Sequence, residues 1–199
     1  TPVFFYSRSA IETRWRAYAS AFGARPHRVC YAVKANDNLS VLQALHSVGE
    51  AFDIVSAGEL QRALSVGAQA SAIVFSGVGK TSAEIAQAID SGVGCINVES
   101  VDELERIAAL AAARGQVVDV ALRVNPDVDP QTHPYMSTGL KENKFGIPLT
   151  DAPALYRHIQ TLPALRANGI ACHIGSQLTT VAPLLAAVTE VVAVAESLR

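Results

Sequence analysis

Residues 95–124 have the sequence CINVESVDELERIAALAAARGQVVDVALRV, in which two apolar runs flank a helical pattern. The pattern predicts strands over 95–98 and 118–124 and a helix over 101–114. The apolar positions of that helix fall on one face, and they are Leu104, Ile107, Ala108, Leu110 and Ala111. A strand, a helix and a second strand in this order predict a parallel pair joined by a right-handed crossover.

The same unit repeats on both sides of this stretch. Strands are predicted over 29–33, 52–55, 73–75, 95–98, 118–124 and 170–174. Helices are predicted over 9–22, 40–48, 58–66, 82–90, 101–114, 151–162 and 181–198. The aromatic stretch 1–6 is predicted as a further strand. The first five repeated strands start about 22 residues apart, which is the length of one β/α unit with short loops.

The gap before the sixth strand contains a long stretch rich in Pro and Gly, residues 125–148. A loop of this length inside a compact domain is usually an active-site element. Six β/α units fit an α/β fold that is part of a (β/α)₈ barrel, which takes about 250 residues when complete. We therefore expect residues 1–199 to be one incomplete barrel domain, with both chain ends cut from a longer protein. The spacing does not exclude an open doubly wound sheet.

Charge and composition restrict the class of protein. Hydrophobic residues make up 50% of the chain, and 16 Lys and Arg stand against 18 Asp and Glu. There is no basic excess to bind nucleic acid, and no apolar run reaches the ~20 residues of a membrane span. The three cysteines lie far apart and lack the spacing of metal ligands. Each is predicted to be a small buried side chain, and their low, odd number indicates a reducing compartment. We expect a cytoplasmic protein that uses no metal.

Two phosphate-binding motifs are incomplete around residues 74–82. Gly79-Lys80-Thr81 resembles the end of a Walker A loop, but Val74 stands where that motif needs glycine. Gly77 and Gly79 begin a dinucleotide fingerprint, but Ser82 stands at its third glycine. This segment is therefore predicted to be a tight turn between a strand and a helix.

Lys34 is the most informative single residue, because it closes the first predicted strand. Barrel enzymes keep their chemistry at the carboxyl ends of the strands. An amine held there can lose its proton and attack a carbonyl to form a Schiff base. A surface lysine at a strand end remains the alternative interpretation of its position alone.

Other predicted strand ends also carry polar side chains. Asp53 interrupts the second strand, Arg123 lies near the end of the fifth, and His173 closes the sixth. Glu59 is predicted in the first turn of a helix, where a carboxylate favours the helix dipole. Each alone has a structural explanation, but together they predict a polar ring around an amine, which is typical of a cofactor site.

The segments that carry these residues resemble a known family. They are 31–36 (YAVKAN), 52–60 (FDIVSAGEL), 75–81 (FSGVGKT), 123–126 (RVNP), 133–139 (HPYMSTG), 144–147 (KFGI) and 173–177 (HIGSQ). Over the whole chain they are similar to the alanine-racemase-like, fold-type III enzymes of pyridoxal 5′-phosphate. Within that group the resemblance is to the diaminopimelate decarboxylase branch.

The resemblance implies roles for matching positions. Lys34 is similar to the lysine that holds the cofactor as an internal aldimine, and His173 to the imidazole stacked on the pyridine face. Ser176 is similar to the serine beside the cofactor phosphate. Residues implied near the cofactor ring and its hydrogen-bond network are Asp53, Glu59 and Arg123. Lys144 matches a segment near the homodimer interface of relatives.

The implied activity is decarboxylation of meso-2,6-diaminopimelate to L-lysine and CO₂, in a homodimer with shared active sites. Family elements that follow the sixth strand lie beyond residue 199, among them a phosphate loop and a β-rich domain. We therefore expect the 199 residues alone to be inactive. Three alternatives stay open: a related decarboxylase of ornithine, arginine or a carboxylated polyamine, a non-catalytic carrier of the cofactor, and an inactive regulatory homologue.

Overall fold

The computed structural model describes residues 2–49, 51–128, 145–176 and 178–198. The predictions for Lys144 and for residues 133–139 therefore fall outside the described residues. The contacts divide the chain into two compact units, Thr1–Gly94 and Cys95–Arg199. Each unit is described by itself.

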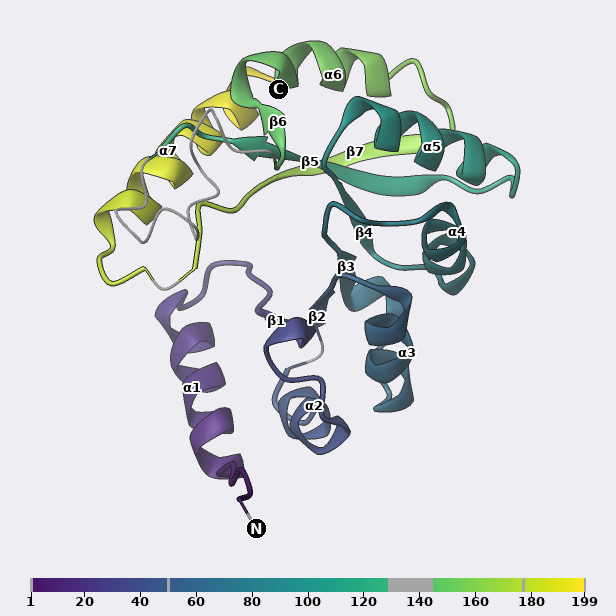
Figure 1. Cartoon of the computed structure of the whole chain (residues 1–199). Coiled ribbons are helices and arrows are strands. Elements are labelled where there is room, and N and C mark those ends of the chain that lie inside the picture. Colours follow the sequence, from purple (N-terminus) through teal and green to yellow (C-terminus); the bar gives the residue numbers. More distant parts are fainter. Residues whose placement is uncertain (1, 50, 129–144, 177, 199) are drawn as a thin grey trace. The chain divides into compact units, whose positions relative to one another are not determined.

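The first unit contains three short parallel strands and the helices that follow them (Figure 1). Its elements are α1 (Arg8–Ala21), β1 (Cys30–Ala32), the 3-10 turn η1 (Val33–Ala35), α2 (Leu39–His46), β2 (Ala51–Ile54), α3 (Ala57–Ser65), the 3-10 turn η2 (Ala70–Ala72), β3 (Ile73–Phe75) and α4 (Ser82–Ser91). Strand β2 pairs with β1 on one side and β3 on the other. This order is the one predicted for consecutive β/α units.

Alternation along β2 and β3 separates the core from the polar face. Phe52 and Ile54 of β2 and Ile73 and Phe75 of β3 are at most 1% exposed. Successive side chains of a strand point to opposite faces, so Asp53 lies on the other face of the sheet. The buried face packs against helices, and the half-buried face carries the polar residues of interest.

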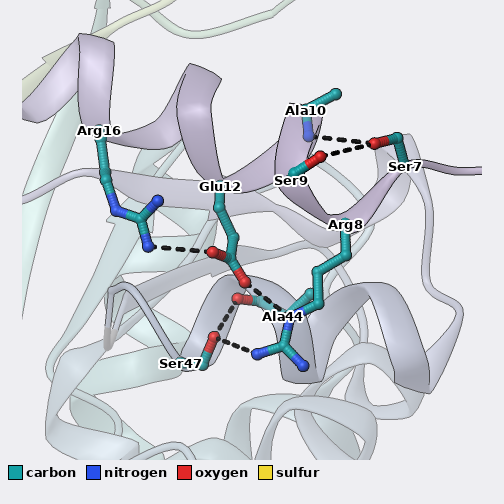
Figure 2. A network of polar contacts seen from close by, with 8 residues as sticks. All are labelled: Ser7, Arg8, Ser9, Ala10, Glu12, Arg16, Ala44 and Ser47. Atoms are coloured by element: carbon teal, nitrogen blue, oxygen red, sulfur yellow. Dashed lines mark hydrogen bonds and ion pairs between the residues drawn. The ribbon is translucent and has the colours of Figure 1, made fainter.

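Helix α1 is held mainly by polar contacts, since none of its residues is buried. Figure 2 shows Glu12 between Arg8 and Arg16, with N–O distances of 2.6 and 2.9 Å. The Arg8 guanidinium also donates to Ser47 Oγ at 3.2 Å, beyond the end of α2. Hydrogen bonds from Arg8 and then Arg16 lower the pKa of Glu12. One charged cluster therefore ties the first turns of α1 to α2.

The Trp15 indole is the apolar part of this attachment. A Cβ built on Gly49 would lie 2.3 Å from Trp15 Cζ2. A side chain at position 49 would require the Trp15 ring to move, so glycine there lets α1 approach the end of α2.

The second unit is built around the long strand β5. Its elements are β4 (Cys95–Val98), α5 (Val101–Ala112), β5 (Val118–Asn125), β6 (Ile147–Pro148), the 3-10 turn η4 (Leu149–Asp151), α6 (Ala152–Ile159), β7 (Leu165–Cys172) and α7 (Ala182–Ser197). Strands β4, β6 and β7 all run parallel to β5. The even positions Val118, Val120, Leu122 and Val124 are at most 6% exposed and form the buried face of β5.

Strand β7 starts five residues earlier than the predicted 170–174. The early part contains Arg166 and Asn168, both of which donate to the Asp119 carboxylate of β5. A register shift follows between Val120 and Ala121 of β5. The polar segment had no strand pattern of its own, because its pairing depends on a cross-strand partner.

The other expectations are mostly confirmed. The structure has the α/β fold of part of a (β/α)₈ barrel, and the other predicted repeated strands and helices occur within about three residues of their expected ends. Two predictions were wrong. Residues 2–7 form no strand, and Phe4 and Phe5 are 91% and 92% exposed, because Ser7 already caps α1 and no described strand pairs with them. The predicted loop 125–148 ends in the short strand β6. None of the described helices is long and apolar enough to cross a membrane.

Candidate functional site

The carboxyl ends of β1, β2 and β3 gather the polar residues of the first unit. Ala32, Asp53 and Val74 are opposite one another in register. Lys34 and Ser76 follow two residues after Ala32 and Val74 respectively. The parallel register therefore brings an amine, a carboxylate and a hydroxyl to one edge of the sheet.

Lys34 was predicted to close the first strand, but β1 ends at Ala32 and Lys34 lies two residues later, in η1. Val33 before it is fully buried, and Asn36 N–H donates to Val33 O at 3.1 Å. Tyr31 Oη donates to Asn36 O at 3.4 Å. The backbone around Lys34 is thus fixed, while its side chain is exposed at the edge of the sheet.

Asp53 is held by Ser76, a residue that the sequence analysis did not single out. Ser76 Oγ donates to Asp53 Oδ1 at 2.5 Å, and Ser76 N–H donates to Ile54 O at 2.8 Å. The carboxylate is therefore oriented across the β2–β3 pair. The same rule that selected Lys34, a polar side chain at a strand end, would have selected Ser76.

Glu59 lies in the first turn of α3, as predicted. Its Oε2 accepts from Val55 N–H at 2.7 Å. Burial raises the pKa of Glu59 against the lowering effect of that hydrogen bond. The charges of Asp53 and Asp37 raise it further and Lys34 lowers it. The charges of Asp53, Asp37 and Lys34 therefore all act on Glu59 within the first unit.

Glu84 occupies the corresponding position of α4, in a different environment. Its Oε2 accepts from Thr81 N–H at 3.0 Å, and its Oε1 accepts from Ala57 N–H at 3.1 Å. These backbone hydrogen bonds lower the pKa of Glu84. The carboxylate joins the start of α4 to the start of α3.

The two glutamates are expected to give opposite pH dependence. Because the pKa of Glu59 is raised in the fold, its contribution to stability is lost as pH rises through that pKa. Because the pKa of Glu84 is lowered, its contribution is present at higher pH and is lost on acidification. Relative to wild type, Glu59→Gln should gain stability between about pH 4 and 7, and Glu84→Gln should lose it. Urea unfolding at both ends of this pH range checks this, and a shift of the same sign in both variants contradicts it.

In the second unit, Arg123 lies near the end of β5 on the face opposite its buried positions. Its Nη1 donates to Glu99 Oε1 at 2.7 Å, and the side chains are 15% and 5% exposed. Glu99 N–H in turn donates to Glu103 Oε2 at 2.7 Å. Glu99 follows β4 directly and, like Ser76, was not singled out by the sequence analysis. A buried ion pair with a fixed backbone is a rigid support for a site.

The segment before β6 holds the end of β5. Asn125 Nδ2 donates to Phe145 O at 2.8 Å, and the Arg123 guanidinium lies 6.0 Å from the centre of the Phe145 ring. Gly146 has a φ of +79°, and a Cβ there would lie 3.1 Å from Arg123 O. Only glycine permits this approach.

His173 follows the last residue of β7, two positions after Ala171, which is opposite Arg123. Its Nδ1 accepts from Gly175 N–H at 3.2 Å. This contact assigns the proton of a neutral imidazole to Nε2. Ser176 lies in the exposed bend that follows. The predicted site residues therefore form two groups, with Lys34, Asp53 and Glu59 in the first unit and the others in the second.

Comparison with known proteins identifies the family. Residues 8–199 match the family described as "Pyridoxal-dependent decarboxylase, pyridoxal binding domain". The chain belongs to this family.

Individual decarboxylases resemble the whole chain. The diaminopimelate decarboxylase of Haemophilus influenzae is 49% identical over 199 residues, and that of Pseudomonas aeruginosa 52% over 198. Each match covers 100% of this chain and 48% of the relative. The crystal structure of the Helicobacter pylori diaminopimelate decarboxylase with L-lysine has a TM-score of 0.97 and 41% identity, over 100% of this chain and 50% of that one. The chain spans about half the length of these relatives.

The three cysteines of this pyridoxal-dependent decarboxylase chain are half-buried in or beside the sheets. Burial raises the pKa of the Cys30 and Cys172 thiols, and raises that of Cys95 to about 11. Such thiols stay protonated and unreactive at neutral pH. The sequence pattern predicted small buried side chains, and the structure finds the three cysteines half-buried.

Proposed function

We propose that the complete protein carrying this chain is a pyridoxal 5′-phosphate-dependent decarboxylase. Its reaction would convert meso-2,6-diaminopimelate to L-lysine and CO₂. The similarity of 49–52% over the whole chain to diaminopimelate decarboxylases supports the substrate. The observation that carries the chemistry is the exposed Lys34 amine at the strand edge that also holds Asp53 and Ser76. Residues 1–199 would then be the cofactor-binding part of the barrel.

The described residues fit a pyridoxal cofactor by their chemical types. Lys34 offers a primary amine for an aldehyde, His173 a flat ring, and Ser176 an exposed hydroxyl for a phosphate oxygen. Arg123, with Glu99 as its counter-charge, offers a fixed cation. When bound, pyridoxal 5′-phosphate supplies an electron sink for the pair of electrons that remains as a carboxylate leaves.

The role of this chain's own residues follows from their contacts. Lys34 would hold the cofactor covalently through the amine that it offers at the strand edge. The Asp53 carboxylate is oriented by Ser76 and lies in register with Ala32, two residues before Lys34. The hydrogen bond to His173 Nδ1 keeps the imidazole in one orientation, with its proton at Nε2. A homodimer with shared sites stays a prediction of the resemblance, and a cytoplasmic location stays a prediction from the cysteine pattern.

Reductive trapping tests the role of Lys34. Borohydride added to the complete protein with pyridoxal 5′-phosphate should convert the bond between lysine and cofactor to a stable amine. Peptide mass mapping should then place the label on Lys34, because its amine is exposed at the strand edge. Lys80, which is 3% exposed, is the internal control and should stay unlabelled. A label on Lys80, Lys141 or Lys144 would overturn the assignment.

Substrate choice is tested separately on the same preparation. CO₂ release should be measured with meso-diaminopimelate, ornithine and arginine at equal concentration. We expect release from diaminopimelate alone. Lys34 labelling with faster release from ornithine or arginine would keep the cofactor assignment and overturn the substrate.

A further inference from the structure

Lys80 is a buried lysine that the proposed chemistry does not use. It lies in the loop between β3 and α4 and is 3% exposed. Its Nζ donates to Gly77 O at 2.5 Å and lies 5.7 Å from the centre of the Phe75 ring. Lysine is almost never fully buried unless its ammonium has partners, because desolvation of the charge is costly. The position therefore needs an explanation beyond packing.

The Lys80 ammonium holds the turn that carries Ser76. By donating to the carbonyl of Gly77, it closes the loop back on the residue next to Ser76. Gly77 has a φ of +99°, and a Cβ there would lie 3.2 Å from Val55 Cβ. The Gly77 backbone is thus held by Lys80 on one side and packed against the end of β2 on the other.

The position of this turn decides where the Ser76 hydroxyl lies. Ser76 N–H donates to Ile54 O, and its Oγ donates to Asp53 Oδ1 at 2.5 Å. Asp53 in turn is in register with Ala32, two residues before Lys34. A continuous set of contacts therefore leads from the buried ammonium of Lys80 to the polar edge where the exposed amine of Lys34 lies.

We propose that Lys80 is a positioning residue of the decarboxylase, which sets the Ser76–Asp53 pair through the Gly77 carbonyl and so orients the site around Lys34. This inference rests on the proposed function. Thr81, the next residue, acts differently, because its Oγ1 accepts from Glu84 N–H and caps α4. Substitution of Lys80 therefore tests the geometry of the loop, whereas substitution of Thr81 tests the stability of α4.

A double-mutant cycle on the complete protein tests the proposal. Lys80→Met keeps the apolar stem and removes the donor, Ser76→Ala removes the hydroxyl, and the double variant removes both. Each single variant should raise the dissociation constant for pyridoxal 5′-phosphate, measured by equilibrium dialysis, and lower kcat by about tenfold. Because both act through one contact path, the double variant should also show about tenfold rather than hundredfold effects.

Thr81→Ala is the matched control. It should lower the midpoint of thermal unfolding through loss of the cap, with cofactor affinity and kcat within about twofold of wild type. Lys80→Arg keeps a cationic donor and should recover at least part of the cofactor affinity that Lys80→Met loses. If Lys80→Arg does not fold, the cycle with Ser76→Ala still decides the question.

Two results would overturn the inference. One is Lys80→Met behaving like Thr81→Ala, with a change in stability alone. The other is multiplication of the single effects in the double variant, which would show independent roles. Failure of the proposed function is distinct, because wild type itself would then carry no cofactor on Lys34 after borohydride treatment.

Discussion

Substitution of Lys34 by alanine is expected to lower kcat of the complete enzyme by on the order of 10³-fold or more. Alanine has no amine to react with the cofactor aldehyde. No other described lysine is exposed at a strand edge to replace it. The free energy of unfolding without cofactor should change by less than about 0.5 kcal/mol, because the side chain is exposed. CO₂ release and urea unfolding measure the two quantities separately.

Lys34→Arg is the control for charge. Arginine keeps the positive charge beside Asp53 and Glu59 but stays protonated and cannot act as the amine nucleophile. It should therefore be as inactive as Lys34→Ala. Activity in Lys34→Arg near that of wild type would mean that position 34 contributes charge alone, and would contradict the covalent role.

The local pattern was sufficient to predict much of the fold. Strands β3 and β4 lie at 73–75 and 95–98 as expected, because short β-branched runs are bounded there by turns and helix caps. Ser56, Thr81 and Ser100 each accept at Oγ or Oγ1 from the backbone N–H of a glutamate three residues later. This recurrence of one N-capping pattern marks the helix starts within the sequence itself.

The errors occurred where structure depends on a distant partner. The start of β7 is stabilised by Asp119, 47 residues from Arg166 in sequence. Strand β6 is two residues long and pairs with Val124 and Asn125 of β5. Two residues are too few to show an alternating strand pattern in the sequence. Residues 2–7 had the aromatic composition of a strand but no described neighbour to pair with. Composition alone does not provide that neighbour.

Prediction of the site had the same limit. Position at a strand end identified Lys34 and Asp53, and the first-turn position identified Glu59. The partners Ser76, Glu99 and Lys80 were missed as such, because each contact joins residues whose pairing follows from register and loop geometry. The sequence around Lys80 indicated only an incomplete phosphate-binding motif, and the tight turn predicted there is confirmed between β3 and α4.

Gly94→Ala is expected to be the most destabilising replacement of a glycine by alanine in the first unit, at about 3 kcal/mol or more. A Cβ at position 94 would lie 2.2 Å from Ser71 O, which is backbone and cannot rotate away. Gly94 N–H also lies 3.0 Å from both Ala70 O and Ile73 O. Relief of the clash would move η2 and the fully buried start of β3. Urea unfolding of the complete protein measures the loss.

Two other glycines make the control. Gly92 ends α4 with a φ of +75° and has open space around a built Cβ, so Gly92→Ala should cost only the backbone strain, about 1 kcal/mol. Gly79 has open space and no such φ, so Gly79→Ala should leave stability unchanged or raise it by up to about 1 kcal/mol. The three variants add the same methyl group within sixteen residues of one another, counting from 79 to 94.

The order of the three changes in stability is therefore the test of the close approach at Gly94. Conformational entropy of the unfolded chain favours alanine equally at all three positions, so it cannot produce the expected ranking. Gly92→Ala should be less stable than Gly79→Ala because of backbone strain. Gly94→Ala should be less stable than both because of the contact with Ser71 O. A loss at Gly94 no larger than that at Gly92 would mean that η2 moves freely. The carboxyl end of β3, and with it Ser76, would then have a less rigid base than the structure indicates.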